Sequence, residues 1–240
     1  MYTQRRFPMK GLLIWTIRET LFFIFFATVF TFLYKVVNIK WLQVPLVPVS
    51  LIGTAVAFMV GFQNNAAYDR IWEARKIWGG IVNGSRSLII NIRDSFYLHS
   101  AEQKVEEKQI LKVIANRHIA WLTALRYAMR AKKQWETNYN YNHKKTVYQY
   151  NIPEFKSQLV DELKPFLSEI ELSKVMQKDN KPNAIISLQS QHLRMLTDEN
   201  KFWHFSFLNF QQSLQELTAL QGKAERIKNF PYPKQYGSIG

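Results

Sequence analysis

The sequence predicts an all-α membrane protein, in which an N-terminal transmembrane helical hairpin carries a helical bundle in the cytosol. Residues 41–68 contain no charged side chain, and a second apolar stretch precedes them at residues 21–33. About 20 apolar residues cross a bilayer as a helix, so both stretches are long enough once the first is extended slightly. With 21% charged residues and a mean hydropathy of −0.22, most of the remaining chain must face water.

We expect the two spans at about residues 11–34 and 41–64, within a hairpin that occupies residues 1–68. The first span reaches back to residue 11 only if Arg18 and Glu19 are tolerated near its start, where a long charged side chain can extend to the interface. Only residues 35–40 separate the spans, so these residues form the tip of an antiparallel hairpin. A cleaved signal peptide is the alternative, but its apolar region is usually shorter and no A-x-A site follows here.

Basic residues flank the hairpin unequally. Those beside its outer ends are Arg5, Arg6, Lys10, Arg70, Arg75 and Lys76, and those in its tip are Lys35 and Lys40. Lys and Arg close to a span are retained on the cytoplasmic side. We therefore expect a multi-pass protein of the cell's inner (plasma) membrane, with both ends of the hairpin and the bulk of the chain in the cytoplasm.

The water-facing part, residues 69–230, is predicted to be helical because its apolar residues recur every three or four positions. We expect helices at residues 71–92, 104–130, 155–166, 183–196 and 202–227, the last beginning behind the polar residues 197–200. No window alternates strictly between apolar and polar residues, so no sheet is expected. Three glycines weaken the first of these helices and usually allow a close approach by another segment: Gly79, Gly80 and Gly84.

Composition and motifs argue against several functions. The absence of cysteine excludes disulfides and thiolate chemistry and fits a reducing cytoplasm. No two histidines form an i, i+4 pair around a Glu, and the glycines of residues 79–84 lack the Lys-Ser/Thr ending of a phosphate loop. We therefore expect no enzymatic activity, no catalytic residue, no metal and no cofactor. The net charge of +14 suits nucleic acid, anionic lipid or anionic permeant ions, although the Lys- and Tyr-rich residues 132–151 fit a solvated loop better than a nucleic-acid site.

Two neighbouring ridges run along the second span. The packing ridge consists of small residues four apart: Gly53, Ala57 and Gly61. The neck stripe lies about 100° further round the helix: Thr54, Phe58 and Phe62. Small residues let helices pack closely in lipid, so one ridge can pack while the other lines a space, although a buried helix would show the same residues. A single hairpin cannot enclose a hole, so any pore requires several copies about an axis.

Residues 61–80 resemble the signature of the bestrophin family in its prokaryotic branch, G-F-x-N-N-x-x-Y-x-R-x-x-E-A-R-x-x-W-G. A second match is the run Glu225-Arg226-Ile227, followed by Pro231, Pro233 and Tyr236. With similar helical spacing between the two motifs, the resemblance covers nearly the whole chain.

The resemblance implies a homopentameric channel for small monovalent ions, chloride among the candidates, in which each subunit contributes its second transmembrane helix to a central pore. The neck stripe then forms a hydrophobic neck, which can gate by dewetting, with Thr54 where the family usually has an apolar residue. Just inside it, three amides either rehydrate the ion or bond neighbouring backbone: Gln63, Asn64 and Asn65. A second constriction in the cytosol is expected at Ile185, with Ile186 as the rival.

The resemblance also implies that residues 231–240 lead back to the membrane and that two further transmembrane helices follow Gly240. Animal members hold calcium in an acidic cluster that has no counterpart here, so calcium gating is not expected. Animal relatives pass anions and bacterial ones are associated with cations, so selectivity stays open. The expected partners are membrane lipid, permeant ions and copies of the chain, without nucleic acid. The alternative is a non-conducting, membrane-anchored helical adaptor whose basic domain binds anionic lipid or a partner protein.

Overall fold

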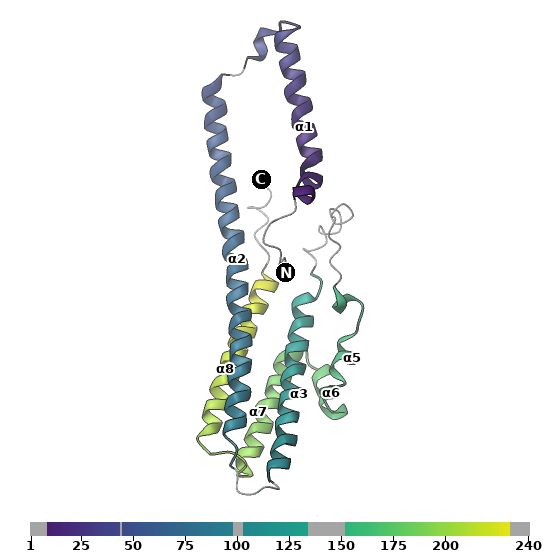
Figure 1. Cartoon of the computed structure of the whole chain (residues 1–240), viewed down its shortest axis with the longest axis vertical. Coiled ribbons are helices and arrows are strands. Elements are labelled where there is room, and N and C mark those ends of the chain that lie inside the picture. Colours follow the sequence, from purple (N-terminus) through teal and green to yellow (C-terminus); the bar gives the residue numbers. More distant parts are fainter. Residues whose placement is uncertain (1–8, 44, 98–102, 134–151, 231–240) are drawn as a thin grey trace. The chain divides into compact units, whose positions relative to one another are not determined.

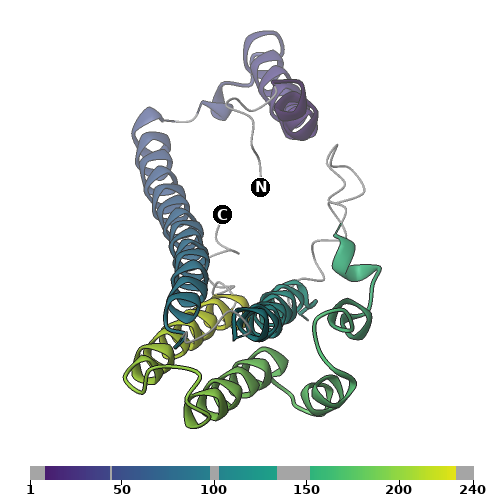
Figure 2. The same ribbon diagram turned by 60° about the horizontal axis from the view of Figure 1, so that its bottom comes forward.

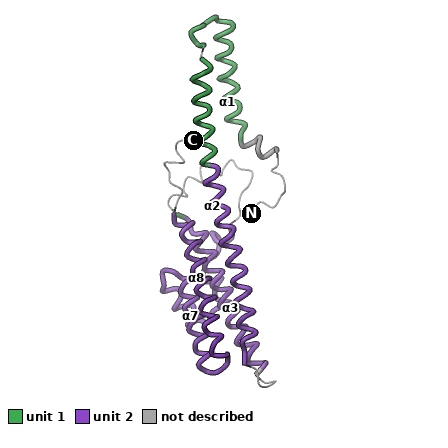
Figure 3. Tube along the Cα trace, turned by 90° about the vertical axis from the view of Figure 1, so that its left-hand side faces the viewer, with its two compact units in different colours: residues 1–63, 133–151, 240 green, residues 64–132, 152–239 purple. Residues whose placement is uncertain are grey.

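The computed structural model describes residues 9–43, 45–97, 103–133 and 152–230 (Figure 1). The chain divides into two compact units, one of residues 1–63, 133–151 and 240, the other of residues 64–132 and 152–239 (Figure 3). Apart from connecting segments and one isolated antiparallel bridge between Phe96 and Phe202, the described residues are helical. The prediction of an all-α membrane fold without a sheet is therefore confirmed for this part of the chain.

The first unit contains two long helices joined by a short connection. Helix α1 covers Met9–Lys35, a 3₁₀ turn η1 covers Lys40–Leu42, and helix α2 starts at Leu46. Helix α2 thus begins five residues after residue 41, and the point at which the second span enters the bilayer stays a prediction. A proline cannot donate the intrahelical hydrogen bond, so Pro45 and Pro48 are accommodated only where a helix begins.

Helix α2, Leu46–Asp94, is one continuous helix of 49 residues. The second span and the separately expected helix at residues 71–92 are therefore parts of the same element. The structural division between the two units falls between Gln63 and Asn64. The expected end of the hairpin at residue 68 concerns the bilayer boundary and stays a prediction.

Within the described residues, the second unit is a bundle built from the rest of α2 and five further helices (Figure 2). Its long helices are α3, Gln103–Arg130, α7, Lys181–Asp198, and α8, Ser206–Asn229. Its short ones are α5, Leu159–Leu163, and α6, Glu169–Met176, after the 3₁₀ turn η3, Pro153–Phe155. Helix α3 packs against α5, α7 and α8, and α7 packs against α6 and α8.

Two of the expected helices are wrong in detail. The single helix at residues 155–166 is replaced by η3 and α5, and a new helix, α6, begins at a capping box formed by Ser168 and Glu171. The polar residues 197–200 do not start the last helix; they end α7, where Asn200 adopts a left-handed φ of 56° that Asn tolerates. Helix α8 instead begins after Phe205, whose side chain makes no capping bond.

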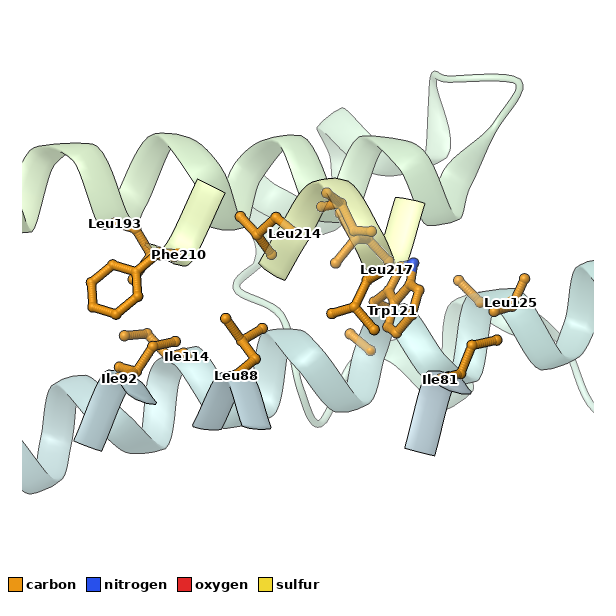
Figure 4. Packing of buried hydrophobic residues seen from close by; sticks show 14 of the residues in the cluster. Ile81, Leu88, Ile92, Ile114, Trp121, Leu125, Leu193, Phe210, Leu214 and Leu217 are labelled. Atoms are coloured by element: carbon orange, nitrogen blue, oxygen red, sulfur yellow. The ribbon is translucent and has the colours of Figure 1, made fainter. Parts of the chain in front are cut away.

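One apolar cluster holds the second unit together (Figure 4). Helix α2 contributes one stripe of buried residues spaced by about one or two turns: Ile77, Ile81, Leu88 and Ile92. They face residues of α3, α7 and α8, including Trp121, Leu193 and Leu217. Ideal Cβ atoms on Gly80 and Gly84 would lie 3.1 and 3.0 Å from side-chain carbons of Leu220 and Leu217, so these glycines do permit a close approach by α8, whereas Gly79 faces open space.

Several predictions fall outside the described residues. They concern the N-terminal Arg5 and Arg6, most of the Lys- and Tyr-rich residues 132–151, and the segment 231–240 with Pro231, Pro233 and Tyr236. The side chains of residues 9–15, among them Lys10, also lie outside the description.

Candidate functional site

The neck stripe is exposed in the single chain. Phe58 and Phe62 have 64% and 71% of their surface accessible, and Thr54 is also exposed. The hydroxyl of Thr54 donates a 2.8 Å hydrogen bond to the carbonyl of Ser50, so its polar group is satisfied within α2 itself. The two aromatic side chains contribute nothing to the core formed by the described residues, so they can line or cover another surface.

The packing ridge is equally unoccupied in one chain. Ideal Cβ atoms on Gly53 and Gly61 would meet no other described atom within 4 Å, and Ala57 is exposed. Small side chains that no described segment approaches are available for contact with a helix from another copy.

The rest of the hairpin also turns apolar side chains outward. Helices within Thr16–Lys35 and Lys40–Asp94 are long and apolar enough to cross a bilayer, and none of the apolar window in either is buried. On α1, Phe23 and Phe25 expose 69% and 64% of their surface. The hydroxyls of Thr28 and Thr31 bond carbonyls one turn back at 2.8 and 2.7 Å, which leaves the helix surface apolar. Such a surface is stable in contact with lipid or other apolar helices rather than water.

The three amides that follow the neck stripe lie on α2. Asn64 and Asn65 are exposed, and Gln63 is partly buried. The geometry leaves both predicted roles open, because exposed amides can hydrate an ion or bond a neighbouring backbone.

The prediction that Ile185 forms a cytosolic constriction is wrong. This side chain has 0% of its surface exposed and belongs to the apolar core of the second unit, while its rival Ile186 is 9% exposed. A side chain enclosed by its own subunit cannot narrow a solvent-filled path. The resemblance placed the constriction on α7, but Ile185 lies on the core-facing stripe of this amphipathic helix.

The two sequence motifs meet in space, and this contact was not foreseen from the sequence. Nη2 of Arg70, in the first motif, donates hydrogen bonds of 2.6 and 2.7 Å to the carbonyl oxygens of Ile227 and Phe230 at the end of α8. Arg226, in the second motif, pairs with Glu73 at 2.7 Å. The last carbonyls of a helix lack intrahelical partners and carry partial negative charge, so the Arg70 cation caps α8. We call these contacts the α2–α8 clasp; the opposite charges of Glu73 and Arg226 are the signal in the sequence that could have indicated part of it.

A polar network surrounds Gln221 of α8, close in sequence to Arg226 of the clasp. The indole Nε1 of Trp121 donates a 2.8 Å bond to Oε1 of Gln221, which is buried. Nε2 of Gln221 donates to Glu225 at 2.9 Å and to Asn180 at 3.2 Å, and Asn180 caps α7 by accepting from the amide of Asn183. The network links α3, α7 and α8 and satisfies polar groups that burial would otherwise penalise.

A second buried network centres on Arg117 of α3. Its guanidinium donates to Glu171 at 2.6 Å and to Gln189 at 3.0 Å, and it contacts Nδ1 of His192 at 2.9 Å. Burial opposes the charge of Glu171, but hydrogen bonds from Arg117 and Ser168 outweigh it and lower the pKa of this carboxyl. Burial and the neighbouring Arg117 cation lower the pKa of His192, which favours the neutral ring whose Nδ1 can accept from Arg117.

His118, the next residue along α3, is 7% exposed and packs on Trp121 with ring centroids 5.1 Å apart. Its Nε2 is buried without a hydrogen-bond partner among the described residues. Burial lowers the pKa of His118 to about 4. The described residues contain no group of three or more His, Asp or Glu side chains that could hold a metal ion. His118 is thus buried in the second unit, whereas His192 is partly buried.

An exposed apolar hairpin and a helical bundle clasped by two family motifs define a helical membrane protein of the bestrophin type. The chain belongs to the bacterial and fungal bestrophin family, whose profile matches residues 2–239. This is a family of channels rather than of enzymes.

The chain resembles curated bacterial proteins along most of its length. It is 27% identical over 204 residues to a voltage-dependent anion channel-forming protein of Ralstonia nicotianae, covering 83% of this chain and 56% of the relative. It is 25% identical over 194 residues to a protein of the same description from Escherichia coli, covering 81% and 53%. The chain thus spans about half the length of these relatives.

A solved structure shares the fold. A crystal structure of a bacterial bestrophin homologue from Klebsiella pneumoniae superposes with a TM-score of 0.73 and 21% identity, over 93% of this chain and 72% of that one.

Proposed function

We propose that this chain forms the pore of a homopentameric ion channel in the bacterial inner membrane, with the neck stripe of α2 as its hydrophobic gate. The bulk of the chain lies in the cytoplasm, as the basic residues around the hairpin indicate. One observation carries the proposal: Phe58 and Phe62 expose 64% and 71% of their surface on a span that no described part of the chain covers.

Assembly supplies what the single chain lacks. Ideal Cβ atoms on Gly53 and Gly61 would meet no other described segment within 4 Å, so the packing ridge suits close contact with α2 of a neighbouring copy. The neck stripe would then face the symmetry axis and form stacked apolar rings, which expel water from a narrow pore. The relatives' description as anion channel-forming proteins supports small monovalent anions as the first ions to test.

The experiment is planar-bilayer recording of the protein expressed from its natural gene, with Phe58 and Phe62 both changed to Ala. Removing the rings widens the constriction and removes the surface that expels water, so open probability or conductance should rise. The matched control changes Phe23 and Phe25 of α1 to Ala, which removes two equally exposed aromatic rings from the other span.

Oligomeric mass is measured first, because Phe side chains that bury area between subunits also support assembly. A variant that stays pentameric with currents equal to those of the parent would place the gate elsewhere. Reversal potentials under a salt gradient decide the charge of the permeant ion.

A further inference from the structure

A line of exposed residues continues along α2 beyond the charge-free residues 41–68. We call it the outer stripe, and its members follow one another at steps of three or four residues: Trp72, Arg75, Gly79, Val82, Arg86 and Ile90. All six are exposed in the single chain, with 43%, 45% and 48% of the surface of Trp72, Val82 and Ile90 accessible. Steps of three and four keep side chains on one side of a helix, so the outer stripe is a single face of α2.

The outer stripe lies away from the core of its own subunit. The core-facing residues of α2 are at most 4% exposed, and Figure 4 shows three of them directed into the apolar cluster: Ile77, Ile81, Leu88 and Ile92. At about 100° per residue, their mean direction is about 150–160° from that of the outer stripe. This part of α2 therefore has two apolar faces, and the described helices of the bundle bury only one of them.

The outer stripe continues the packing ridge of the second span. Gly61 and Gly79 are 18 residues apart, which is about five full turns, so they point in the same direction along the continuous helix α2. Ideal Cβ atoms on Gly53, Gly61 and Gly79 would meet no other described segment within 4 Å. The ridge also includes Ala57, so a methyl group at Gly79 suits the same kind of contact. A helix that packs on the ridge meets a similar surface further along α2.

Lipid cannot cover the far half of the outer stripe. Counted from Leu46, where α2 begins, the helix rises about 54 Å to Val82 and about 66 Å to Ile90. A bilayer with its headgroups is about 40–45 Å thick, and an average tilt of about 20° shortens these heights by only about 6%. Val82 and Ile90 therefore lie in water beyond the headgroups, where half-exposed apolar side chains favour contact with protein.

A second copy of the chain is the partner that assembly brings to this height. Because α2 is one helix of 49 residues, a neighbouring copy whose second span lies beside this one has an equally long continuation outside the bilayer. The composition of the stripe suits such a contact, since Trp, Tyr and Arg are enriched in protein interfaces. Trp72 stacks on Tyr68 with ring centroids 6.2 Å apart, and the guanidinium carbon of Arg75 lies 5.8 Å from the centre of the Trp72 ring.

We propose that the outer stripe is the water-facing part of the contact between neighbouring copies of this chain. The inference deepens the proposed function, because it rests on the assembly of copies about an axis but not on ion conduction. Lipid tails are as apolar as the side chains, so the packing ridge gains no hydrophobic stabilisation within the bilayer. The outer stripe does gain it, because its apolar surface leaves water on assembly. In a closed ring the contact is head-to-tail, so the stripe of one copy meets a different surface of the next.

The test places a photoreactive benzophenone amino acid at Ile90 of the protein expressed from its natural gene. This group reacts with whatever covers it, whichever surface of the neighbour that is, so irradiation of cell membranes should give a covalent dimer of the chain. Asn91 is the matched control, because it is exposed at nearly the same height but points about 100° away. The same group at Asn91 should give several-fold less dimer.

A pair of variants measures what the apolar surface contributes. Changing Val82 and Ile90 together to Asn should weaken each contact between copies about 100-fold, at about tenfold for each apolar side chain that assembly buries. Changing both residues to Leu keeps the apolar surface and should preserve the association. Native mass spectrometry over a dilution series in detergent compares the two variants. The unfolding temperature of the bundle should stay the same in both, because neither side chain belongs to the apolar core.

The outcomes separate this inference from the proposed pore. Adducts only with lipid, with the same chain or with another protein, in a preparation that is oligomeric by mass, would overturn the inference and leave the pore proposal standing. Equal labelling from Ile90 and Asn91, or unchanged dissociation of the Asn variant, would also overturn it. A monomeric parent would overturn both proposals. An oligomer that dissociates with the Asn changes but passes no current would support the outer stripe and refute the channel alone.

Discussion

Removing Arg70 should loosen the end of α8 far more than removing the neighbouring ion pair. Nη2 of Arg70 donates to two carbonyls at 2.6 and 2.7 Å. A hydrogen bond from a charged donor contributes about 1.5–3 kcal/mol. Because the Phe230 carbonyl is exposed, and water replaces part of that bond, we expect Arg70→Gln to lower the local opening free energy by about 2–3 kcal/mol.

Glu73→Gln is the matched variant on the same face of the clasp. It removes the ion pair with Arg226, in which the Glu73 side chain is 46% exposed and the Arg226 side chain 66% exposed. Exposed ion pairs contribute less than about 1 kcal/mol. We therefore expect Arg70→Gln to loosen the end of α8 more than Glu73→Gln, although both variants remove a charge from the motif at residues 61–80.

Hydrogen–deuterium exchange of the peptide covering residues 222–230 measures the difference. A loss of 2–3 kcal/mol corresponds to exchange that is about 30- to 150-fold faster in Arg70→Gln, against less than about fivefold in Glu73→Gln. Peptides from the centre of α3 report on the core and should not change. Similar exchange in the two variants would refute the capping role of Arg70.

Three further predictions test packing, titration and assembly. Gly84→Ala places a Cβ 3.0 Å from Leu217 and should lower the free energy of unfolding by about 1–2 kcal/mol. Gly79→Ala, in open space, should instead raise it by up to about 1 kcal/mol. Thermal unfolding in detergent compares the two variants, and equal shifts would count against the close packing of α8. His118 has a folded pKa of about 4 against about 6.5 when unfolded, so the unfolded state binds the proton first and stability should fall by about 3 kcal/mol between pH 6.5 and 4. His118→Phe should flatten that dependence in the same unfolding assay, and an unchanged slope would assign it to other groups. Ala57→Leu should disperse the oligomer seen by native mass spectrometry while Val56→Leu preserves it; an unaltered mass in both would exclude the packing ridge from the interface.

Local patterns in the sequence carried much of the fold. The charge-free residues 41–68 predicted an apolar helix, because a bilayer leaves no other way to satisfy the backbone. The three- and four-residue spacing of apolar side chains predicted α3, α7 and α8, and the long motif at residues 61–80 predicted the family. Each of these features depends on residues close together in the chain, so periodicity and spacing were sufficient.

Helix ends were predicted less well, because they depend on which partner satisfies the terminal backbone groups. The capping box at Ser168 and Glu171 starts a helix that periodicity alone did not separate from its neighbours. The polar residues 197–200 read equally well as the start of one helix or the end of another, and the left-handed Asn200 decided for the end of α7.

The sequence by itself determined the membrane helices, the helical bundle and the family, since these follow from composition, periodicity and a contiguous motif. Only the tertiary structure decided which apolar residues face inward: Ile185 and Phe58 are both apolar residues of helices, yet Ile185 is enclosed in the core and Phe58 is 64% exposed. Only the tertiary structure joined Arg70 to Ile227 and Phe230 across more than half of the chain. Periodicity identifies a face of a helix, but the identity of the surface that covers that face depends on residues distant in sequence.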